Sequence, residues 1–250
     1  MKILITGGNG YIAKSLANKL DNTTSITRKD FNLTDRESTN NWFDGKHFDV
    51  VIHTAVVGGS RLKKDNGDTF YQNIQMFYNL LNNKHHFNKL IHFGSGAELN
   101  MPTDPYGLSK NVISKIIDSE PNFYNIRIFG VFDENELDTR FIKTCIKNYK
   151  NRKPILIHQN KLFDFIYMDD LVTIINFIIL NPNIKSIDCC YNESYSLKEI
   201  AHYINGLNNH SCDITLKLTN TGLPYIGKFK NYNLNLIGLK QGINNTYYGK

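Results

Sequence analysis

A tyrosine and a lysine stand four residues apart in the segment Tyr106-Gly107-Leu108-Ser109-Lys110. At this spacing both side chains lie on one face of a helix. A cation beside a phenol stabilises the phenolate and lowers the phenol pKa, so Tyr106 is predicted to donate or accept a proton near neutral pH. Ser95, in the loop that precedes this helix, can hydrogen-bond the same carbonyl oxygen of a substrate. The sequence therefore predicts a proton-transfer site made of Ser95, Tyr106 and Lys110.

A glycine pattern, Gly7-x-x-Gly10-x-x-Ala13, directly follows a short apolar segment at residues 2–6. It matches the dinucleotide-binding pattern with alanine in the third place. The first glycine permits a tight turn, the second lets backbone amides approach a pyrophosphate, and Ala13 is small enough for helix packing. The start of the following helix would offer N–H groups and the positive end of its dipole to the phosphates. We expect a bound dinucleotide here; an ordinary turn is the alternative.

Two cations, Arg28 and Lys29, stand where the second strand is expected to end. NAD sites usually place an acidic residue there to hold the ribose 2′-hydroxyl. Arg28 and Lys29 can instead pair with a 2′-phosphate. The expected cofactor is therefore NADPH/NADP; the alternative is that both residues are solvated surface cations.

A regular alternation of strands and helices must position these residues. It implies a parallel sheet with right-handed crossovers, which is an α/β, Rossmann-type doubly wound core. The predicted strands are residues 2–6, 24–27, 49–55, 89–93 and 124–129, and the predicted helices are residues 11–20, 37–43, 69–83 and 106–118.

Beyond about residue 150 the alternation weakens. Strands are predicted at 155–157 and 214–218, and helices at 169–179 and 196–204, the second opened by a capping box of Ser196 and Glu199. The tail from Thr219 is rich in Gly and Asn, and no helix is predicted there. We expect an NADP-binding domain over residues 1–150, to which some later segments return, and a small nucleotide-sugar-binding lobe over residues 151–250.

The composition is that of a globular chain: 250 residues, 41% hydrophobic and 21% charged, with a mean hydropathy of -0.37. Disordered, collagen-like and coiled-coil proteins are excluded. The formal charge of +6 suits nucleic acid or a small anionic substrate. The basic residues are scattered, and together with the motifs this favours the small substrate, so no nucleic-acid partner is expected.

The longest apolar run, residues 172–180, is far shorter than the roughly 20 residues of a membrane-spanning helix, so no membrane contact is expected. Met1 leads directly into the first strand and the glycine loop, without the apolar core of a signal peptide. The four cysteines have no CxxC spacing. We therefore expect a cytoplasmic protein with reduced thiols.

Several other polar residues have structural interpretations. His53 and His92 stand in predicted central strands, where hydrogen-bonded core histidines are expected rather than ligands. The pair His85-His86 lacks carboxylate or cysteine neighbours, so no metal site is expected. Asp169-Asp170 opens a predicted helix, and capping is the expected role.

Taken together, these motifs resemble those of the extended short-chain dehydrogenase/reductase family, also called the NAD-dependent epimerase/dehydratase family. Within it they are similar to the GDP-L-fucose synthase branch of nucleotide-sugar enzymes. The resemblance spans most of the chain. The matching segments are residues 7–13, 27–35, 54–59, 94–95, 106–110, 164–171 and 234–243.

The resemblance implies hydride transfer between NADPH and C4 of a nucleotide-linked keto sugar, with Ser95, Tyr106 and Lys110 as the catalytic triad. The implied substrate is a GDP-linked 4-keto-6-deoxyhexose or 4-keto-heptose, and the implied setting is polysaccharide biosynthesis. A homodimer through the helices at 69–83 and 106–118 is also implied. The residues expected to bind NADP are Gly7, Gly10, Tyr11, Ile12, Thr27, Arg28, Asn32, Leu33, Thr54, Ala55, Val56, Tyr106 and Lys110. Those expected to bind the substrate are Gly58, Ser95, Gly96, Ala97, Tyr106, Arg140 and Lys147.

Two departures from the branch concern epimerisation. Fucose synthases epimerise before they reduce, with a cysteine two residues after the catalytic serine and a histidine past the fifth strand. This chain has Ala97 at the first position and Thr139-Arg140 near the second. Because a methyl group cannot remove a proton, we predict a 4-ketoreductase without 3,5-epimerase activity.

Further departures concern the dehydratase relatives and the diphosphate. Dehydratases need an Asp-Glu pair directly after the hydroxyl residue, where this chain has Gly96-Ala97. Glu98 comes one residue late and is expected to be a loop or substrate contact. Phe163 stands where an arginine usually serves the diphosphate. The candidates to replace that arginine are Lys143, Lys147 and Lys161, with plain surface lysines as the alternative.

Two other functions stay open. One is a 4-epimerase that retains NAD, against which Arg28 and Lys29 argue. The other is a non-catalytic regulatory protein that binds the cofactor, against which the complete triad argues.

Overall fold

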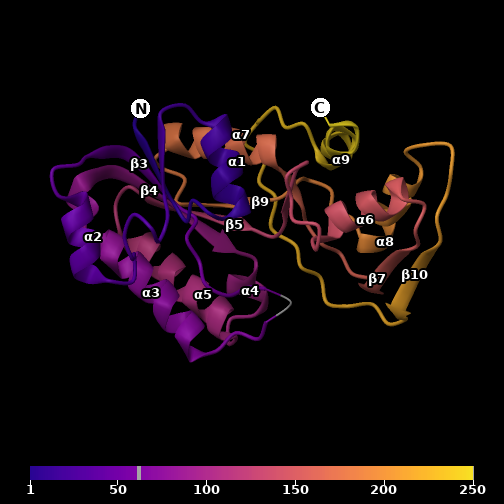
Figure 1. Ribbon diagram of the computed structural model, residues 1–250, viewed down its shortest axis with the longest axis horizontal. Coiled ribbons are helices and arrows are strands. Elements are labelled where there is room, and N and C mark those ends of the chain that lie inside the picture. The colour runs from indigo at the N-terminus through magenta and orange to yellow at the C-terminus, as the bar shows by residue number, and fades with distance from the viewer. Residues whose placement is uncertain (61–62, 250) are drawn as a thin grey trace. The chain divides into compact units, whose positions relative to one another are not determined.

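The structure, a computed structural model, describes residues 1–60 and 63–249 (Figure 1). The chain divides into two compact units: unit 1 comprises residues 1–127 and 175–187, and unit 2 comprises residues 128–174 and 188–250. Residues 128–150, which the sequence suggested for the first domain, group with unit 2, and residues 175–187 return to unit 1. The division of cofactor and substrate roles between the units stays a prediction.

A six-stranded sheet runs through unit 1 in the order β2-β1-β3-β4-β5-β9. β1 pairs in parallel with both β2 and β3, and β3 pairs in parallel with β4. The expected α/β fold with a Rossmann-type doubly wound sheet is confirmed, and β9 adds a strand that was not predicted. The strands are β1 (Ile3–Thr6), β2 (Thr23–Ile26), β3 (Phe48–His53), β4 (Phe87–Ser95), β5 (Phe123–Ile128) and β9 (Ser186–Cys189).

Capping side chains fix where several helices of unit 1 begin. Asp35 accepts a hydrogen bond from Ser38 N at 2.8 Å at the start of α2. Asp104 accepts from Tyr106 N at 3.1 Å at the start of α5, with Pro105 in the first turn. The helices of this unit are α1 (Tyr11–Lys19), α2 (Arg36–Phe43), α3 (Gly67–Asn82), η1 (Lys84–His86), α4 (Ala97–Asn100) and α5 (Pro105–Ser119).

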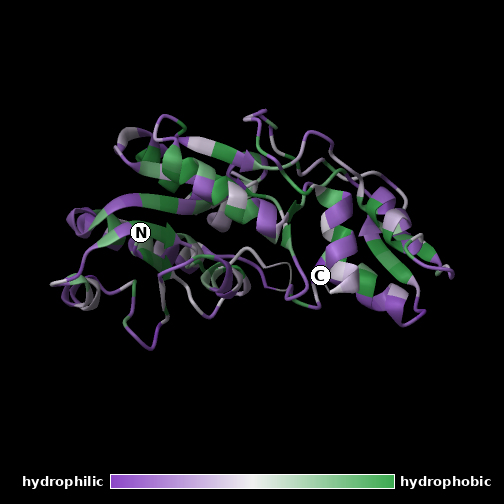
Figure 2. Cartoon of the chain, turned by 90° about the horizontal axis from the view of Figure 1, so that it is seen from above, coloured by the Kyte–Doolittle hydropathy of each residue, from purple (hydrophilic) through white to green (hydrophobic). Residues whose placement is uncertain are grey.

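Helices cover both faces of the sheet, which explains why β1 and β3 are nearly continuous in apolar residues. All of β1 is buried. On one face, α2, α3 and α5 pack over a cluster that includes Val51, Phe77 and Ile113. α1 and residues 175–180 of α7 (Met168–Leu180) lie on the opposite face (Figure 1). Hydrophobic and hydrophilic residues mix along these helices, as expected for elements with one buried face (Figure 2).

Unit 2 has an apolar core of its own, which includes Phe132, Tyr149, Ile200 and Ile243. Two short strand pairs, β7 with β10 and β6 with β8, are parallel. The elements are β6 (Val131–Phe132), α6 (Phe141–Lys150), β7 (Ile155–Gln159), β8 (Ile166–Tyr167), α8 (Leu197–Asn205), β10 (Ile214–Leu218) and α9 (Leu239–Tyr248).

The capping box predicted at the start of α8 is confirmed, because Glu199 N donates to Ser196 Oγ at 3.2 Å and Ser196 N donates to Glu199 Oε2 at 2.7 Å. α6 and α9 were not predicted. α9 lies in the tail, where Leu239, Ile243 and Tyr247 recur at helical spacing and are buried.

Asp170 does not cap α7, contrary to the prediction. Its carboxylate is buried and accepts the N–H groups of Ile237 at 2.7 Å and Gly238 at 3.0 Å. The Tyr191 hydroxyl donates to the same carboxylate. Asp170 therefore holds the tail immediately before α9.

Within the described ranges, no helix combines the length and the apolar character needed to cross a membrane. The four cysteines all lie in these ranges and none forms a disulfide; Cys145, Cys189 and Cys190 are buried.

Candidate active site

The glycine loop between β1 and α1 is shaped for close approach of another backbone or a ligand. Gly7 has a φ of +76°, and a Cβ there would lie 2.8 Å from Ala55 Cα, so only glycine fits. A Cβ on Gly8 would lie 2.5 Å from Ser25 Oγ. Gly10 begins α1 without a side-chain cap from the described part of the chain. The positive end of the α1 dipole is therefore available to a phosphate, as the glycine pattern predicts.

The turn after β2 presents two cations to solvent beside this loop. The Asp30 carboxylate accepts from Thr27 N at 2.7 Å and from Thr27 Oγ1 at 3.0 Å, and these hydrogen bonds lower the Asp30 pKa. Arg28 and Lys29 are exposed on the turn. Gly8 N donates to Ile26 O at 2.8 Å, which ties the glycine loop to the end of β2.

The other residues expected to bind the cofactor lie at or near the ends of these strands. Tyr11 and Ile12 open α1 and are partly buried. Asn32 is exposed, and its side chain accepts from Thr34 Oγ1 at 2.9 Å. Leu33 is buried, so its side chain belongs to the core of unit 1.

The segment after β3 is tied to the end of β1. Thr54 Oγ1 donates to Thr6 O at 2.6 Å, and Ala55 N donates to Thr6 Oγ1 at 3.2 Å. Val56 is exposed. The order of the sheet reverses between β1 and β3, and in doubly wound sheets the ligand crevice lies at the carboxyl ends of the strands at this point.

Asn73 of α3 links this segment to α5. Its side chain accepts from Val57 N at 2.8 Å and donates to Val57 O at 2.9 Å. It also donates to Ser109 Oγ at 3.1 Å, and Ser109 Oγ donates to Tyr106 O at 2.7 Å. Asn73 is buried and was not predicted, because its partners are distant in the sequence.

A pair of glycines brings the same segment against the predicted catalytic tyrosine. Gly58 and Gly59 have φ values of +85° and +69°. A Cβ on Gly59 would lie 2.8 Å from Tyr106 Cζ, and one on Gly58 would lie 2.2 Å from Asp65 Oδ1. Glycine is therefore required at both positions, and the loop lies against the Tyr106 ring.

Lys110 is buried beside Tyr106. Its Nζ donates to Phe93 O at 2.7 Å and lies 5.9 Å from the centroid of the Tyr106 ring. Burial lowers the pKa of Lys110 to about 8, although the nearby charge of Glu98 acts to raise it. The lysine thus keeps its charge at neutral pH next to the phenol, which is the arrangement that the spacing of the two residues predicts.

Gly107, between these two residues, lets α5 pack directly on α4. A Cβ on Gly107 would lie 2.0 Å from Met101 O and 2.8 Å from Ala97 O. Because α4 begins two residues after Ser95, this backbone contact positions Tyr106 relative to Ser95. No local signal in the sequence predicts this role of Gly107.

Ser95 ends β4 and is buried. Its Oγ accepts from Ala97 N at 3.1 Å, and its N donates to Glu98 Oε1 at 2.9 Å. Gly96 is the N-cap residue of α4, and Ala97 is buried. Glu98 is 1% exposed and lies in α4, so the prediction of a loop or substrate contact is wrong: its carboxylate is an internal group.

The two strand histidines are buried core groups, as predicted, but His92 Nδ1 has no hydrogen-bond partner among the described residues. His53 Nδ1 lies 2.8 Å from Thr6 Oγ1, and the His53 ring centroid lies 5.3 Å from that of His92. Burial, together with the charge of Lys110, lowers the pKa of His53 to about 3 and holds that of His92 well below its usual value. Both rings are therefore neutral near pH 7.

The cations predicted to contact the substrate diphosphate lie in unit 2. Arg140 is the N-cap residue of α6 and is exposed. Lys147 pairs with Asp138 on the surface, and Lys143 Nζ donates to Glu134 O. Lys161 Nζ lies 5.3 Å from the centroid of the Phe163 ring. The ion pair of Lys147 agrees with the alternative of a plain surface lysine.

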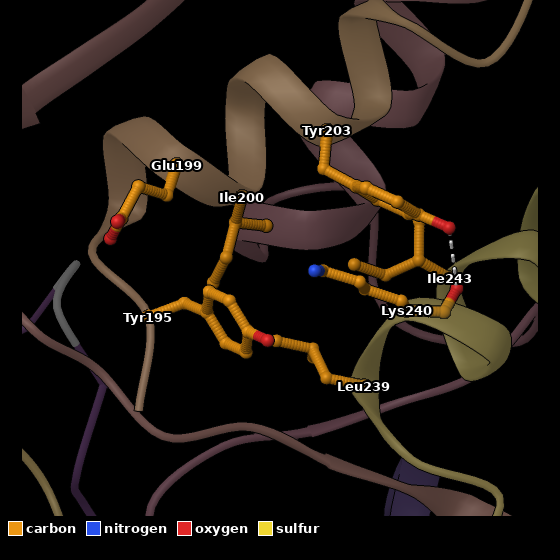
Figure 3. A pocket seen from close by; sticks show the side chains of 7 residues that line it. All are labelled: Tyr195, Glu199, Ile200, Tyr203, Leu239, Lys240 and Ile243. Atoms are coloured by element: carbon orange, nitrogen blue, oxygen red, sulfur yellow. Dashed lines mark hydrogen bonds between the residues drawn. The ribbon is translucent and has the colours of Figure 1, made fainter. Parts of the chain in front are cut away.

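A pocket of about 290 Å³ lies between α8 and α9 of unit 2 (Figure 3). The side chain of Lys240 lines this pocket. Its Nζ lies 5.1 Å from the ring centroid of Tyr195 and 5.9 Å from that of Tyr203. None of the predicted site residues lines this pocket. The lining residues are Tyr195, Glu199, Ile200, Tyr203, Leu239, Lys240 and Ile243.

Comparisons with known proteins agree with this arrangement. The model of the NAD dependent epimerase/dehydratase family matches residues 3–192. Protein CapI of Staphylococcus aureus is 25% identical over 234 residues, which cover 73% of this chain and 70% of CapI.

Two solved structures have the same fold. The GDP-mannoheptose C4 reductase of Campylobacter jejuni, solved with NADP bound, superposes with a TM-score of 0.80 at 18% sequence identity. The match covers 99% of this chain and 97% of the reductase chain. The GDP-L-fucose synthetase of Naegleria fowleri, solved bound to NADP, superposes with a TM-score of 0.76 at 17% sequence identity. The match covers 98% of this chain and 91% of the synthetase chain.

Proposed function

The chain belongs to the NAD dependent epimerase/dehydratase family, and from this premise we propose that it is an NADPH-dependent reductase of the C4 keto group of a nucleotide-linked sugar. The observation that carries the proposal is the placement of Lys110. Its ammonium is buried, anchored to Phe93 O at 2.7 Å and 5.9 Å from the ring centroid of Tyr106. A charge at this place favours proton donation by the phenol.

The cofactor fits the glycine loop. A Cβ on Gly7 would collide with Ala55 Cα and one on Gly8 with Ser25 Oγ, so the backbone of this loop must stay bare. α1 begins at Gly10 without a side-chain cap from the described residues. When bound, NADPH supplies a hydride. Arg28 and Lys29 are exposed at the end of β2, where they can pair with a 2′-phosphate, and the two solved relatives described above were both solved with NADP.

The protein's own groups handle the proton. The Tyr106 hydroxyl donates its proton to the C4 oxygen, and the Lys110 charge stabilises the phenolate that remains. The Ser95 hydroxyl donates a hydrogen bond to the same oxygen. Tyr106 then recovers a proton from solvent.

Reduction without 3,5-epimerisation follows from the small side chain at Ala97. This methyl group is buried in α4 and carries no proton acceptor. The second epimerisation position falls near Thr139-Arg140, where this chain has no histidine. We expect the product to keep the configuration that the substrate has at C3 and C5.

The substrate is proposed to be a GDP-linked 4-keto-6-deoxyhexose or 4-keto-heptose, because both solved relatives are described as acting on or making GDP-linked sugars. Arg140 and Lys147 are the proposed contacts of the substrate in unit 2. A homodimer through α3 and α5 is supported by exposed apolar side chains on these helices, namely Tyr71, Tyr78 and Leu108. The cytoplasmic location and the role in polysaccharide biosynthesis stay predictions.

The test follows NADPH consumption with GDP-4-keto-6-deoxymannose, alongside the dTDP- and UDP-linked sugars. Oxidation of NADPH by the wild type, together with its loss in Tyr106→Phe, supports the reductase. Interconversion of 4-epimers without net NADPH loss would indicate an epimerase instead. Tight NADPH binding without turnover of any sugar would indicate a regulatory protein.

A further inference from the structure

Glu98 is a buried carboxylate that the mechanism above does not use. It is 1% exposed and lies in α4, three residues after Ser95. Its Oε2 accepts from Asn125 Nδ2 at 3.1 Å and lies 3.7 Å from Arg127 Nη1, both on β5. A charge held this far from solvent is retained only when it has partners, and β5 supplies both of these.

The same carboxylate holds the backbone of Ser95, because Ser95 N donates to Glu98 Oε1 at 2.9 Å. Gly94 makes room for it: a Cβ on Gly94 would lie 2.2 Å from Glu98 Oε1. The main chain of Glu98 also binds α5, since Asn111 Nδ2 donates to Glu98 O at 3.1 Å. Glu98 thus connects the residue that carries Ser95 Oγ to the helix that carries Tyr106 and Lys110.

Glu98 also acts on Lys110 through its charge. Two cations face the carboxylate, Arg127 from β5 and Lys110 from α5, and both act to lower the Glu98 pKa, which burial raises above its usual value. The two histidines beside Lys110 are neutral. Glu98 is the negative charge that opposes the effect of burial on Lys110.

We propose that Glu98 is a positioning residue: its carboxylate fixes the backbone of Ser95, and its main chain ties that backbone to the helix that carries Tyr106 and Lys110. The proposal rests on the reductase function of Ser95, Tyr106 and Lys110 given above. Two variants separate the reach of the side chain from its charge. Glu98→Gln keeps the length of the side chain and removes its charge, whereas Glu98→Asp keeps the charge and shortens the reach toward Ser95 N.

The first experiment does not depend on turnover. The protein is labelled with ¹⁵N-serine, and the backbone amide signal of Ser95, assigned by its loss in Ser95→Ala, is followed by NMR in deuterated water. In Glu98→Gln, whose amide oxygen can still accept from Ser95 N, the amide is expected to keep the slow hydrogen exchange of the wild type. In Glu98→Asp, which no longer reaches Ser95 N, the exchange is expected to be faster by roughly tenfold or more.

The second experiment measures kcat and the KM for NADPH. Glu98→Asp is expected to lose kcat, by roughly tenfold or more, because the Ser95 hydroxyl is misplaced, while the KM stays within about twofold. Glu98→Gln keeps the reach and an oxygen that accepts from Ser95 N, so it is expected to lose less kcat than Glu98→Asp. Glu37→Gln, an exposed glutamate on α2, is the matched control and should leave both quantities unchanged. Melting temperatures identify any variant that does not fold; Glu98→Asp, which keeps the charge, then carries the test of positioning.

Unchanged exchange of the Ser95 amide, or full kcat, in Glu98→Asp would overturn the positioning role. If the wild type oxidises NADPH with none of the sugars, the proposed function fails. The exchange of the Ser95 amide would still decide whether Glu98 holds the Ser95 backbone.

Discussion

The Lys110 ammonium and the His92 ring meet in the interior of unit 1, with Nζ 3.5 Å from Nε2. Both side chains are buried, and the nearby positive charge helps hold the pKa of His92 well below its usual value. His92 is therefore a neutral acceptor for the lysine. Together with Phe93 O at 2.7 Å, His92 gives the ammonium two acceptors from β4, and Nζ lies 5.9 Å from the centroid of the Tyr106 ring.

This pair predicts the basic side of the pH–rate profile. Because burial lowers the pKa of Lys110 to about 8, the lysine loses its charge as pH rises through that value, and kcat is expected to fall there. Replacing His92 with leucine removes an acceptor for the charged form, so the fall should begin at lower pH. His85→Leu, an exposed histidine, is the control and should leave the profile unchanged. A His92→Leu profile identical to that of the wild type would contradict the role given to His92.

A second prediction concerns the contact of α5 with α4. Gly107→Ala would place its Cβ 2.0 Å from Met101 O, so we expect a loss of roughly 3 kcal/mol or failure to fold. Gly67→Ala, near the start of α3, meets nothing within 4 Å and should be neutral or stabilising by about 0.5 kcal/mol. Urea unfolding of both variants measures the difference. Equal free energies of unfolding for the two variants would show that the packing of α5 does not depend on the close contact at Gly107.

A third prediction concerns the choice of cofactor. Arg28→Ala combined with Lys29→Ala should lower kcat/KM for NADPH by roughly ten- to a hundredfold, because charge-assisted contacts to a 2′-phosphate are lost. The value for NADH should change little. Lys14→Ala, an exposed lysine on α1, controls for the general change in charge. An equal loss of kcat/KM with NADPH and with NADH would mean that these cations do not recognise the 2′-phosphate.

A fourth prediction follows from a buried carboxyl in unit 2. Burial raises the pKa of Glu136 to about 8 from its ordinary 4.5. Between these values the folded chain keeps a proton that the unfolded chain has lost, so the free energy of unfolding falls as pH rises from 4.5 toward 8.

In Glu136→Gln this contribution should disappear, and the variant should lose less stability than the wild type over the same range. The exposed Glu134→Gln should behave like the wild type. Urea unfolding at several pH values provides the measurement. A slope in Glu136→Gln as steep as that of the wild type would assign the pH dependence to other groups.

The sequence predicted the sheet well where its strands are buried on both faces, as in β1 and β3, because continuous apolar runs are a local signal. The spacing of Tyr106 and Lys110 was equally informative, since a helix places i and i+4 together. The triad and the cofactor residues remain predictions.

Other features had no local signal. Glu98, Asn73 and Gly107 act through partners that the fold brings from other elements, so their roles could not be inferred from spacing. α9 was missed because Gly and Asn separate its buried residues, which pack only against the core of unit 2. The sequence predicts a helix cap at Asp170 because the groups that its carboxylate binds, the N–H groups of Ile237 and Gly238, are distant in the sequence.

The central claim, reduction at C4 without epimerisation, is tested most directly by incubating the wild type with NADPH and GDP-4-keto-6-deoxymannose in deuterated water. The account predicts that NADPH is oxidised, that Tyr106→Phe abolishes the oxidation, and that the product carries no deuterium at C3 or C5. Solvent deuterium at C3 or C5 beyond that found without protein, or undiminished oxidation by Tyr106→Phe, would contradict it.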